Sequence, residues 1–371
     1  MDLVGLALEE RSSAKASGLE GVVVADTRLS HVDGERGELL IAGRRAEDLA
    51  LEDPGHFETV VERLLVLAHA QEPRILERLA QARLSAFARV SQLRHALTLP
   101  DAMDSLLAAT AQGSAGSDAL SLLGALPVYV CAGARVRAGQ PPISPDPTRL
   151  TAADFMAMLG LPENPARARA LDAYLVTVSD HGLNASTFAA RVVASTGSDV
   201  MPCIAAGLGA LKGPLHGGAP GPVLDMLDAT ADSDPRIWLE AELAAGRRIM
   251  GMGHRIYRVR DPRAFVFERA LDRLAREDRV ESPIAARLAH ARKVEQAAQA
   301  LLRERHPDRP LCANVEFYTA LLLEAVGIPR ELFTATFAVG RCSGWLAHVA
   351  EQRHTGRLIR PAARYVGPTP D

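Results

Sequence analysis

The chain has 371 residues, of which 48% are hydrophobic, and this is enough for one large domain or two packed ones around a sizeable core. Its net charge of -3 and pI near 6.4 give no global attraction to nucleic acid or to an anionic membrane, so neither is predicted as a partner. The aromatic content of only 4% favours close-packed helices filled by small and aliphatic side chains over β-sandwiches.

The N-terminal 50 residues carry the strand signals. The β-branched run from Gly21 (GVVVADT) predicts one strand, and SHVDGERGELLIAG predicts a hairpin with its turn at Asp33 and Gly34. The start, MDLVGLALEE, is acidic and unlike a signal peptide. Near the C-terminus, RLIRPAARYVG predicts one further short strand.

Everything between these ends predicts helix. Apolar residues recur at helical spacing from Leu171 to Val178 in a segment entered through Pro165, and again after Pro262. Ser282 before Pro283 predicts the N-cap of a long Ala/Leu helix, and Pro329 predicts the start of a last helix that runs to about residue 356. The sequence therefore predicts a mainly α protein with a small N-terminal β-hairpin.

Residues 112–150 are rich in Gly, Pro and Ser, and they predict a surface connection. The apolar stretch from Leu120 lies in this region, contains two glycines and a proline, and is judged too short to span a bilayer. Four widely spaced cysteines form no metal-ligand spacing, so neither a metal site nor a disulfide framework is expected. We expect a soluble, cytoplasmic protein.

His216 lies in the glycine-rich segment GPLHGG, ahead of a helix entered near Pro222. A histidine close to a helix N-terminus tends to stay neutral, and a neutral imidazole can donate a hydrogen bond to an enolate oxygen. The alternative is that the glycines only make a tight turn, which His216 caps.

The segment MGMGHRIYRVRDPR combines glycines, His254 and a cluster of positive charge. Six arginines and one acid, Asp261, lie between Arg247 and Arg263. Such a cluster beside a glycine turn favours a phosphate- or carboxylate-bearing ligand, although a solvated helix end would show the same charge run.

Three further side chains are less clear from their local sequence. His181 follows a helix and is typical of a packed or capping histidine, while Asn184, Ser186 and Thr187 look like the start of the next helix. Glu316 has apolar neighbours, which would raise its pKa and suit a general base, or it is a salt-bridged core acid. Arg341 lies on an apolar helix, where an internal salt bridge, for example to Glu351, is favoured over a substrate carboxylate.

Taken in order, five blocks resemble the citrate synthase family in its short bacterial and archaeal form. They are DHGLNASTFAAR, GPLHGGA, GHRIYRVRDPRA, NVEFY and the GRCSGW to RLIRPAARYVG ending. The match is strong over residues 172–367, recognisable over 18–49 and weak over 51–150. Five motifs in the right order make the resemblance specific.

The resemblance implies condensation of acetyl-CoA with oxaloacetate, as in the tricarboxylic acid cycle. His216 would polarise the thioester carbonyl, Glu316 would remove the methyl proton, and His254 would hydrogen-bond the oxaloacetate carbonyl. The remaining roles are implied by position: His181, Arg263 and Arg341 for oxaloacetate, Arg360 from the other subunit, and Arg258 with the backbone of Gly251, Met252 and Gly253 for CoA. No permanently bound cofactor is implied, because CoA enters as a substrate.

The resemblance also implies a two-domain helical homodimer whose active site lies between the domains. Mapped onto this chain, the first part of the large domain is residues 1–216, the small domain is 217–321, and the second part of the large domain is 322–371. The partners are then oxaloacetate, an acyl-CoA and a second copy of the chain.

Two blocks depart from the family pattern. The family usually has PNVDFYSG, whereas this chain has Ala313, Glu316 and Ala320, and HGGAPGP lacks the family's usual Asn-Glu pair. Glu316 is one methylene longer than aspartate, and a misplacement of about 1 Å can cost roughly a hundredfold in rate. Three alternatives therefore stay open: 2-methylcitrate synthase using propionyl-CoA, a weakly active paralogue kept for binding or assembly, and a citryl-CoA lyase.

Overall fold

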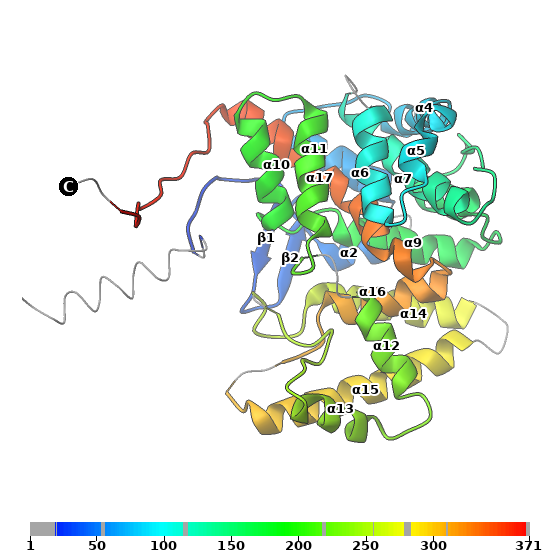
Figure 1. Cartoon of the computed structure of the whole chain (residues 1–371), viewed down its shortest axis with the longest axis vertical. Coiled ribbons are helices and arrows are strands. Elements are labelled where there is room, and N and C mark those ends of the chain that lie inside the picture. Colours follow the sequence, from blue (N-terminus) through cyan, green and yellow to red (C-terminus); the bar gives the residue numbers. More distant parts are fainter. Residues whose placement is uncertain are drawn as a thin grey trace, which may run out of the picture.

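The computed structural model describes residues 19, 21–52, 56–113, 118–216, 220–254, 256–277, 283–308 and 311–368. Helices make up most of this part of the chain, and a three-stranded antiparallel sheet lies near its N-terminal end (Figure 1). The mainly α fold expected from the sequence is confirmed. The elements are β1 Ser30–Asp33, β2 Glu38–Ile41, β3 Arg44–Arg45, α2 Ala46–Leu51, α3 Phe57–Leu67, α4 Ile75–Phe87, η1 Val90–Leu93, α5 Arg94–Leu97, α6 Ala102–Gly113, α7 Ala119–Arg137, α8 Thr151–Leu159, α9 Pro165–Val178, α10 Ala185–Ser195, α11 Val200–Lys212, α12 Pro220–Ala229, α13 Pro235–Ala244, α14 Pro262–Glu277, α15 Pro283–Arg305, α16 Val315–Val326, η2 Arg330–Leu332 and α17 Phe333–Thr355.

The predicted hairpin forms as β1 and β2. Ser30 pairs with Ile41 at one end and Asp33 with Glu38 at the other. The Asp33 carboxylate accepts hydrogen bonds from the backbone N–H groups of Glu35 and Arg36 at 3.0 and 2.9 Å, which satisfies the turn. The two other predicted strands are wrong, because residues 22–27 and 356–368 have no strand partner; Val23, for example, is 83% exposed.

The predicted helix starts are confirmed at Pro165, Pro262 and Pro283, the first residues of α9, α14 and α15. Asn164 accepts the N–H groups of Ala166 and Arg167 ahead of α9, and its Pro165 is the first helical residue as expected. Pro283 begins α15, while its predicted cap, Ser282, lies outside the described residues. The last long helix does not begin at Pro329: the 3₁₀ turn η2 comes first, and α17 then ends at Gly356 with φ +71°.

The expectation of a surface connection over residues 112–150 is wrong for its central part. Residues 119–137 form α7, a 19-residue helix packed against α4, α6 and α8. By length and composition it is the one helix in the described ranges that could cross a membrane. The expectation that this stretch is too short to span a bilayer is therefore also wrong. However, 72% of its most apolar window is buried inside the protein, as in a core helix.

Two groups of helices frame the site (Figure 1). In the upper group of the view, α17 packs against α9, α10 and α11. In the lower group, α13 packs on α15, and α12 packs on α16. Helices α14 and α16 both also contact α9, so they join the two groups. The division at residues 217 and 321 stays a prediction.

Candidate active site

Two short segments pair to build one wall of the site. The N–H of Gly253 donates to Cys312 O at 2.7 Å, and the N–H of Asn314 donates to Gly251 O at 2.9 Å. Both glycines have positive φ, +77° and +81°, and a Cβ on Gly251 would lie 3.0 Å from Phe317 Cβ. The pairing places His254, which follows Gly253, beside the start of α16, which carries Glu316.

His254 has a defined tautomer. Its Nδ1 accepts the backbone N–H groups of Ile256 and Tyr257 at 3.0 and 3.1 Å. Burial, reinforced by the positive charge of Arg263, lowers the pKa of His254 to about 4, so its single proton lies on Nε2 at neutral pH. Arg263 Nη2 lies 3.3 Å from this Nε2. Because both groups are donors, the pair is suited to share an oxygen acceptor placed between them.

Arg263 is held by a buried carboxylate. Its Nε and Nη2 donate to Asp261 at 3.0 and 2.8 Å, and Asp261 also accepts the N–H of Val315 at the start of α16 at 3.1 Å. Asp261 is 1% exposed and Arg263 is 4% exposed. A buried bidentate pair fixes the guanidinium plane, so this loop, α14 and α16 share one rigid anchor.

The arginine-rich segment is largely neutralised within the protein. Arg247 pairs with Glu242 at 2.6 Å, and Arg260 pairs with Glu268 at 2.8 Å. Arg258 is exposed, and its Nε lies 4.0 Å from Glu35. Arg247 and Arg260 therefore form ion pairs within the protein and are not free for the ligand that the sequence predicts. Of these three arginines, Arg258 has the longest ion-pair distance.

His181 contacts the His254 loop from the turn that follows α9. Its Nε2 lies 3.0 Å from the hydroxyl of Tyr257, and its ring centroid lies 6.1 Å from that of His254. Burial and the charges of Arg263 and Arg341 hold the pKa of His181 well below its ordinary value, so the ring is neutral. The packed histidine expected from the local sequence therefore lies in the same cluster as His254.

Arg341 enters this cluster from α17 as a buried cation. Its Nε donates to Val178 O at 2.6 Å, and its guanidinium lies 4.6 Å from the ring centroid of Phe337. Burial lowers its pKa to about 10, which leaves it charged at neutral pH. Its Nη2 is buried without a hydrogen-bond partner among the described residues. Since an unpaired buried N–H is costly, this atom fits a carboxylate supplied by a ligand.

Glu351, which the local sequence offered as a salt-bridge partner for Arg341, is not its partner. Glu351 lies ten residues further along the same helix, about 15 Å at the usual rise. It pairs instead with Arg191 of α10 at 2.6 Å.

His216 lies beyond the end of α11, and a serine holds it in place. Its Nε2 is 2.8 Å from Ser186 Oγ, which also accepts the indole N–H of Trp345 at 3.2 Å. Burial, with the positive charge of Arg341, lowers the pKa of His216 to about 4, so the ring is neutral. The sequence assigned no chemistry to Ser186, which is the first-turn residue that Asn184 caps.

Glu316 is the carboxylate that faces this positive cluster. It is the second residue of α16, and Asn314 caps its backbone N–H at 3.0 Å. No hydrogen bond from the described residues reaches its carboxylate. Burial raises the pKa of Glu316 to about 7, against the lowering effect of Arg263. The expected rise is confirmed, and this value suits a general base at neutral pH.

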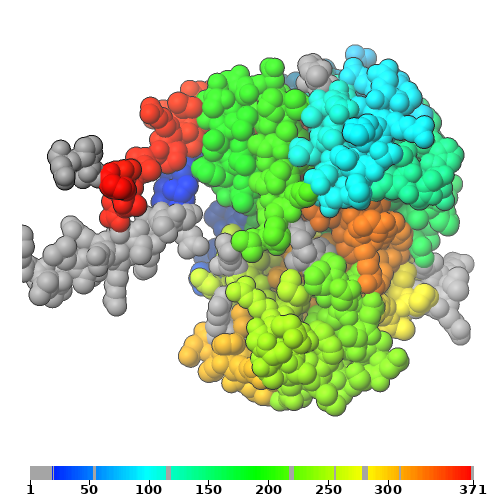
Figure 2. Space-filling model, viewed as in Figure 1, coloured from blue at the N-terminus to red at the C-terminus, as the bar shows by residue number. Residues whose placement is uncertain are grey.

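Arg360 stays apart from these residues within its own chain. It lies in the exposed segment after α17, beside a cavity also lined by Arg191 and Phe188. Figure 2 shows this segment standing out from the body of the molecule. Within the described ranges, no group of three His, Cys, Asp or Glu side chains is placed to hold a metal ion.

Three contacts of the site were not foreseen from the sequence: Ser186 with His216, Tyr257 with His181, and Asp261 with Arg263. Two of them join residues that are 30 and 76 positions apart. Asp261 alone carried a usable signal, as the single acid within the arginine run.

Comparison with known proteins identifies the family to which the chain belongs. The family model for the citrate synthase C-terminal domain matches residues 18–362. The chain belongs to the citrate synthase family. A citrate synthase from Haloferax volcanii is 35% identical over 94% of this chain and 95% of its own length. The predicted enzyme class, a transferase that forms a carbon–carbon bond, is confirmed with the family.

Solved citrate synthase structures have the same fold. The crystal structure of citrate synthase from Pyrobaculum aerophilum is similar with a TM-score of 0.82 and 32% identity, over 95% of this chain and 92% of that one. The citrate synthase from Thermoplasma acidophilum, in a ternary complex with carboxymethyl coenzyme A and oxaloacetate, gives a TM-score of 0.83 and 27% identity, over 96% and 97%. These names do not favour the 2-methylcitrate alternative.

Proposed function

We propose that this citrate synthase condenses acetyl-CoA with oxaloacetate and water to give citrate and CoA. The observation that carries the proposal is the Glu316 carboxyl, with a pKa of about 7, beside two neutral histidines and two buried arginines. This set matches a reaction that removes a proton from a carbon next to one polarised carbonyl group and joins that carbon to a second polarised carbonyl group.

Oxaloacetate binding is assigned to the convergent donors. The unpaired Nη2 of Arg341 fits one carboxylate of the substrate, with His181 beside it. The Nε2–H of His254 and the Nη2 of Arg263 converge on one point, where the ketone oxygen is held and its carbon made electrophilic. Both arginines are already oriented before the substrate arrives, which lowers the cost of ordering them.

Proton transfer is assigned to Glu316 and His216. The ionised Glu316 carboxylate takes a proton from the acetyl methyl group, while neutral His216 donates a hydrogen bond to the thioester oxygen. In the structure the Ser186 hydroxyl donates to Asn184 Oδ1 at 2.8 Å, so this role requires its single proton to turn to His216 Nε2, which leaves the ring proton on Nδ1. The enolate carbon then attacks the ketone carbon, and the ketone oxygen takes the Nε2 proton of His254 to give citryl-CoA. Water hydrolyses the thioester to citrate and CoA, after which Glu316 releases its proton to solvent and His254 takes one back from it.

The acyl-CoA is proposed to lie along the small domain, residues 217–321. The backbone of Gly251, Met252 and Gly253 would lie beside the adenine, and the exposed Arg258 would contact a phosphate. The large domain would comprise 1–216 and 322–371. No bound cofactor is needed for this chemistry.

Arg360 is proposed to complete the active site of a second subunit. Its segment after α17 is exposed, and it carries Leu358, Tyr365 and Val366 at 58%, 71% and 83% exposure. Exposed apolar side chains on an extended segment are suited to pack on another chain. The proposed state is therefore a homodimer. The proposed location is the cytoplasm, and the proposed pathway is the tricarboxylic acid cycle.

The test is an acyl-CoA panel with oxaloacetate, following free thiol, on the wild type and on Glu316→Asp. Acetyl-CoA should give the highest kcat/KM in both proteins, and Glu316→Asp should retain turnover because it keeps a carboxylate. A clear preference for propionyl-CoA would overturn the acetyl-CoA assignment. Oxaloacetate binding without turnover would instead indicate the non-catalytic paralogue.

A further inference from the structure

Tyr257 lies between the two histidines assigned to oxaloacetate and touches both. Its hydroxyl is 3.0 Å from His181 Nε2, and its backbone N–H donates to His254 Nδ1 at 3.1 Å. Its ring centroid is 5.7 Å from that of His181 and 4.8 Å from that of His254. The side chain is 2% exposed, so these contacts are shielded from water.

The contact between the Tyr257 hydroxyl and His181 Nε2 is a hydrogen bond between two uncharged groups. Burial raises the pKa of Tyr257 above its ordinary value, so the phenol stays protonated. His181 is neutral because burial and the charges of Arg263 and Arg341 lower its pKa. A protonated phenol at 3.0 Å from a neutral imidazole nitrogen therefore fixes the rotation of the His181 ring.

The contact joins two parts of the chain that are held by the same hairpin. On one side, the hydroxyl of Ser30 in β1 donates to Asp180 Oδ2 at 2.6 Å and accepts the N–H of Gly182 at 2.8 Å, which brackets His181. The hairpin turn fixes the other side, because the N–H of Arg258 donates to Gly34 O at 2.8 Å.

Gly34 is packed so closely that a Cβ there would collide with the carbonyl oxygen of Ile256. The hairpin therefore sets the spacing between the turn that carries His181 and the loop that carries Tyr257. The Tyr257 hydroxyl closes the gap between them at the substrate site.

We infer that Tyr257 is a positioning residue for oxaloacetate, acting through His181. It ties His181, on the α9–α10 turn, to the His254 loop, so that both histidines present one preformed surface to the substrate. The inference rests on the proposed function only in naming oxaloacetate as the ligand. It assigns Tyr257 no contact with the acyl-CoA and no part in proton abstraction.

The variant Tyr257→Phe tests this, because it removes the hydroxyl and keeps both the ring and the backbone N–H to His254. We expect the Kd of oxaloacetate, measured by calorimetry, to rise about threefold to tenfold, the usual effect of losing one hydrogen bond. The KM for oxaloacetate should rise by the same factor, while kcat at saturation stays within about twofold. The ¹⁵N resonances of the His181 ring should shift in the variant without ligand.

Tyr318→Phe is the matched control. The Tyr318 side chain is equally buried, but its hydroxyl donates to Glu295 of α15 at 2.6 Å and not to a histidine of the site, so its loss should leave the Kd and the His181 resonances unchanged. In a His181→Ala background, Tyr257→Phe should cause no further loss of oxaloacetate affinity if it acts through that ring.

An unchanged Kd in Tyr257→Phe, or an equal loss with and without His181, would overturn the inference. Failure of the proposed function looks different. In that case the wild type would bind oxaloacetate but release no CoA, while the Kd and the His181 resonances would still respond to Tyr257→Phe. A wild type that does not bind oxaloacetate would overturn both.

Discussion

Glu316 is only partly exposed to solvent, and no hydrogen bond from the described residues reaches its carboxylate. Burial therefore dominates its titration and raises its pKa to about 7, whereas the pKa values of His216 and His254 are lowered to about 4. Of Glu316, His216 and His254, Glu316 is therefore the group that changes charge near neutral pH. Both histidines stay neutral down to much lower pH.

This separation predicts the pH profile. A base must be ionised to act, so kcat/KM for acetyl-CoA should rise with pH, level off above about 7, and fall about tenfold per pH unit below it. The measurement is kcat/KM from pH 5 to 9 at saturating oxaloacetate. A kcat/KM that stays constant from pH 9 down to pH 5 would contradict the assignment of Glu316.

The sequence departures around Glu316 do not disturb its support. Ala313 stands where the family usually has proline and forms a bridge with Met252, yet the hydrogen bonds of that bridge involve the backbone of Cys312 and Asn314. Either residue type is therefore compatible with the pairing. Ala320 is fully buried within α16. Nothing in the structure explains the choice of glutamate over aspartate.

At this scale the sequence predicted residue types better than residue partners. The raised pKa of Glu316 and the neutrality of His216 follow from local composition, because apolar or glycine-rich neighbours imply burial. The partner of Arg341 could not be predicted, because its backbone acceptor, Val178 O, is 163 positions away. Tyr257 was missed for the same reason.

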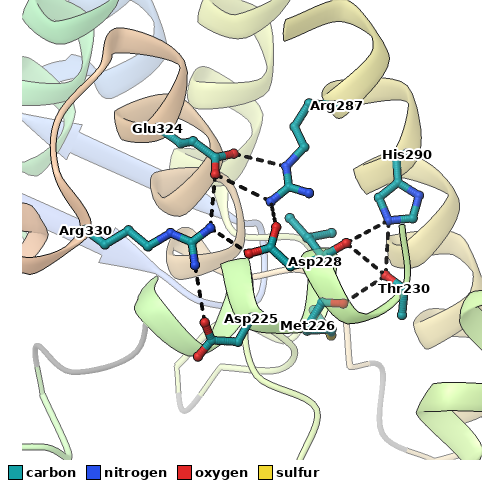
Figure 3. A network of polar contacts seen from close by, with 9 residues as sticks. Asp225, Met226, Asp228, Thr230, Arg287, His290, Glu324 and Arg330 are labelled. Atoms are coloured by element: carbon teal, nitrogen blue, oxygen red, sulfur yellow. Dashed lines mark hydrogen bonds and ion pairs between the residues drawn. The ribbon is translucent and has the colours of Figure 1, made fainter. Parts of the chain in front are cut away.

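At the scale of elements, an ion-pair network braces the helix that carries Glu316 (Figure 3). Asp228 of α12 accepts Arg287 of α15 at 2.6 Å and Arg330 of η2 at 2.7 Å. Both arginines also contact Glu324 of α16, at 3.0 and 3.4 Å. Asp225, one turn earlier on α12, pairs with Arg330 alone among the described residues, at 3.3 Å, and its side chain is 75% exposed.

The two aspartates make a matched pair for a test. Asp228→Asn should lower the free energy of unfolding by about 1 kcal/mol, because it weakens two ion pairs of a network, and Asp225→Asn by less than about 0.5 kcal/mol. Urea unfolding at low and high salt measures both, and the larger effect should shrink in high salt. Equal effects of the two substitutions would show that the network adds nothing beyond isolated surface pairs.

Elements with local signals were predicted well, and those that depend on the rest of the fold were not. The hairpin and α9 carry their own turn and cap residues. The run at residues 22–27 has β-branched side chains but no partner strand, so it stays irregular. Conversely, the Gly- and Pro-containing α7 is helical because it is packed on several sides by other helices.

At the scale of the molecule, the proposed dimer makes Arg360 a residue supplied in trans. Each active site would then take His216 from one chain and Arg360 from the other. Chains with His216→Ala and chains with Arg360→Ala should each be nearly inactive alone, since each pure dimer lacks one of the two groups at both sites.

Mixed dimers test this arrangement. When the two variants are co-expressed with different tags, a mixed dimer has one complete site, so an equal random mixture should recover about a quarter of the wild-type activity. Sedimentation confirms that mixed dimers formed. No recovery in purified mixed dimers would show that Arg360 acts within its own chain, if it acts at all.

The most direct test of the whole account is CoA release by the wild type and by Glu316→Gln, measured with acetyl-CoA in the presence and absence of oxaloacetate. The wild type should release CoA only with both substrates, and Glu316→Gln should be slower by at least about a hundredfold while still binding oxaloacetate. A wild-type rate that Glu316→Gln retains, or no release by a wild type that binds oxaloacetate, would contradict it.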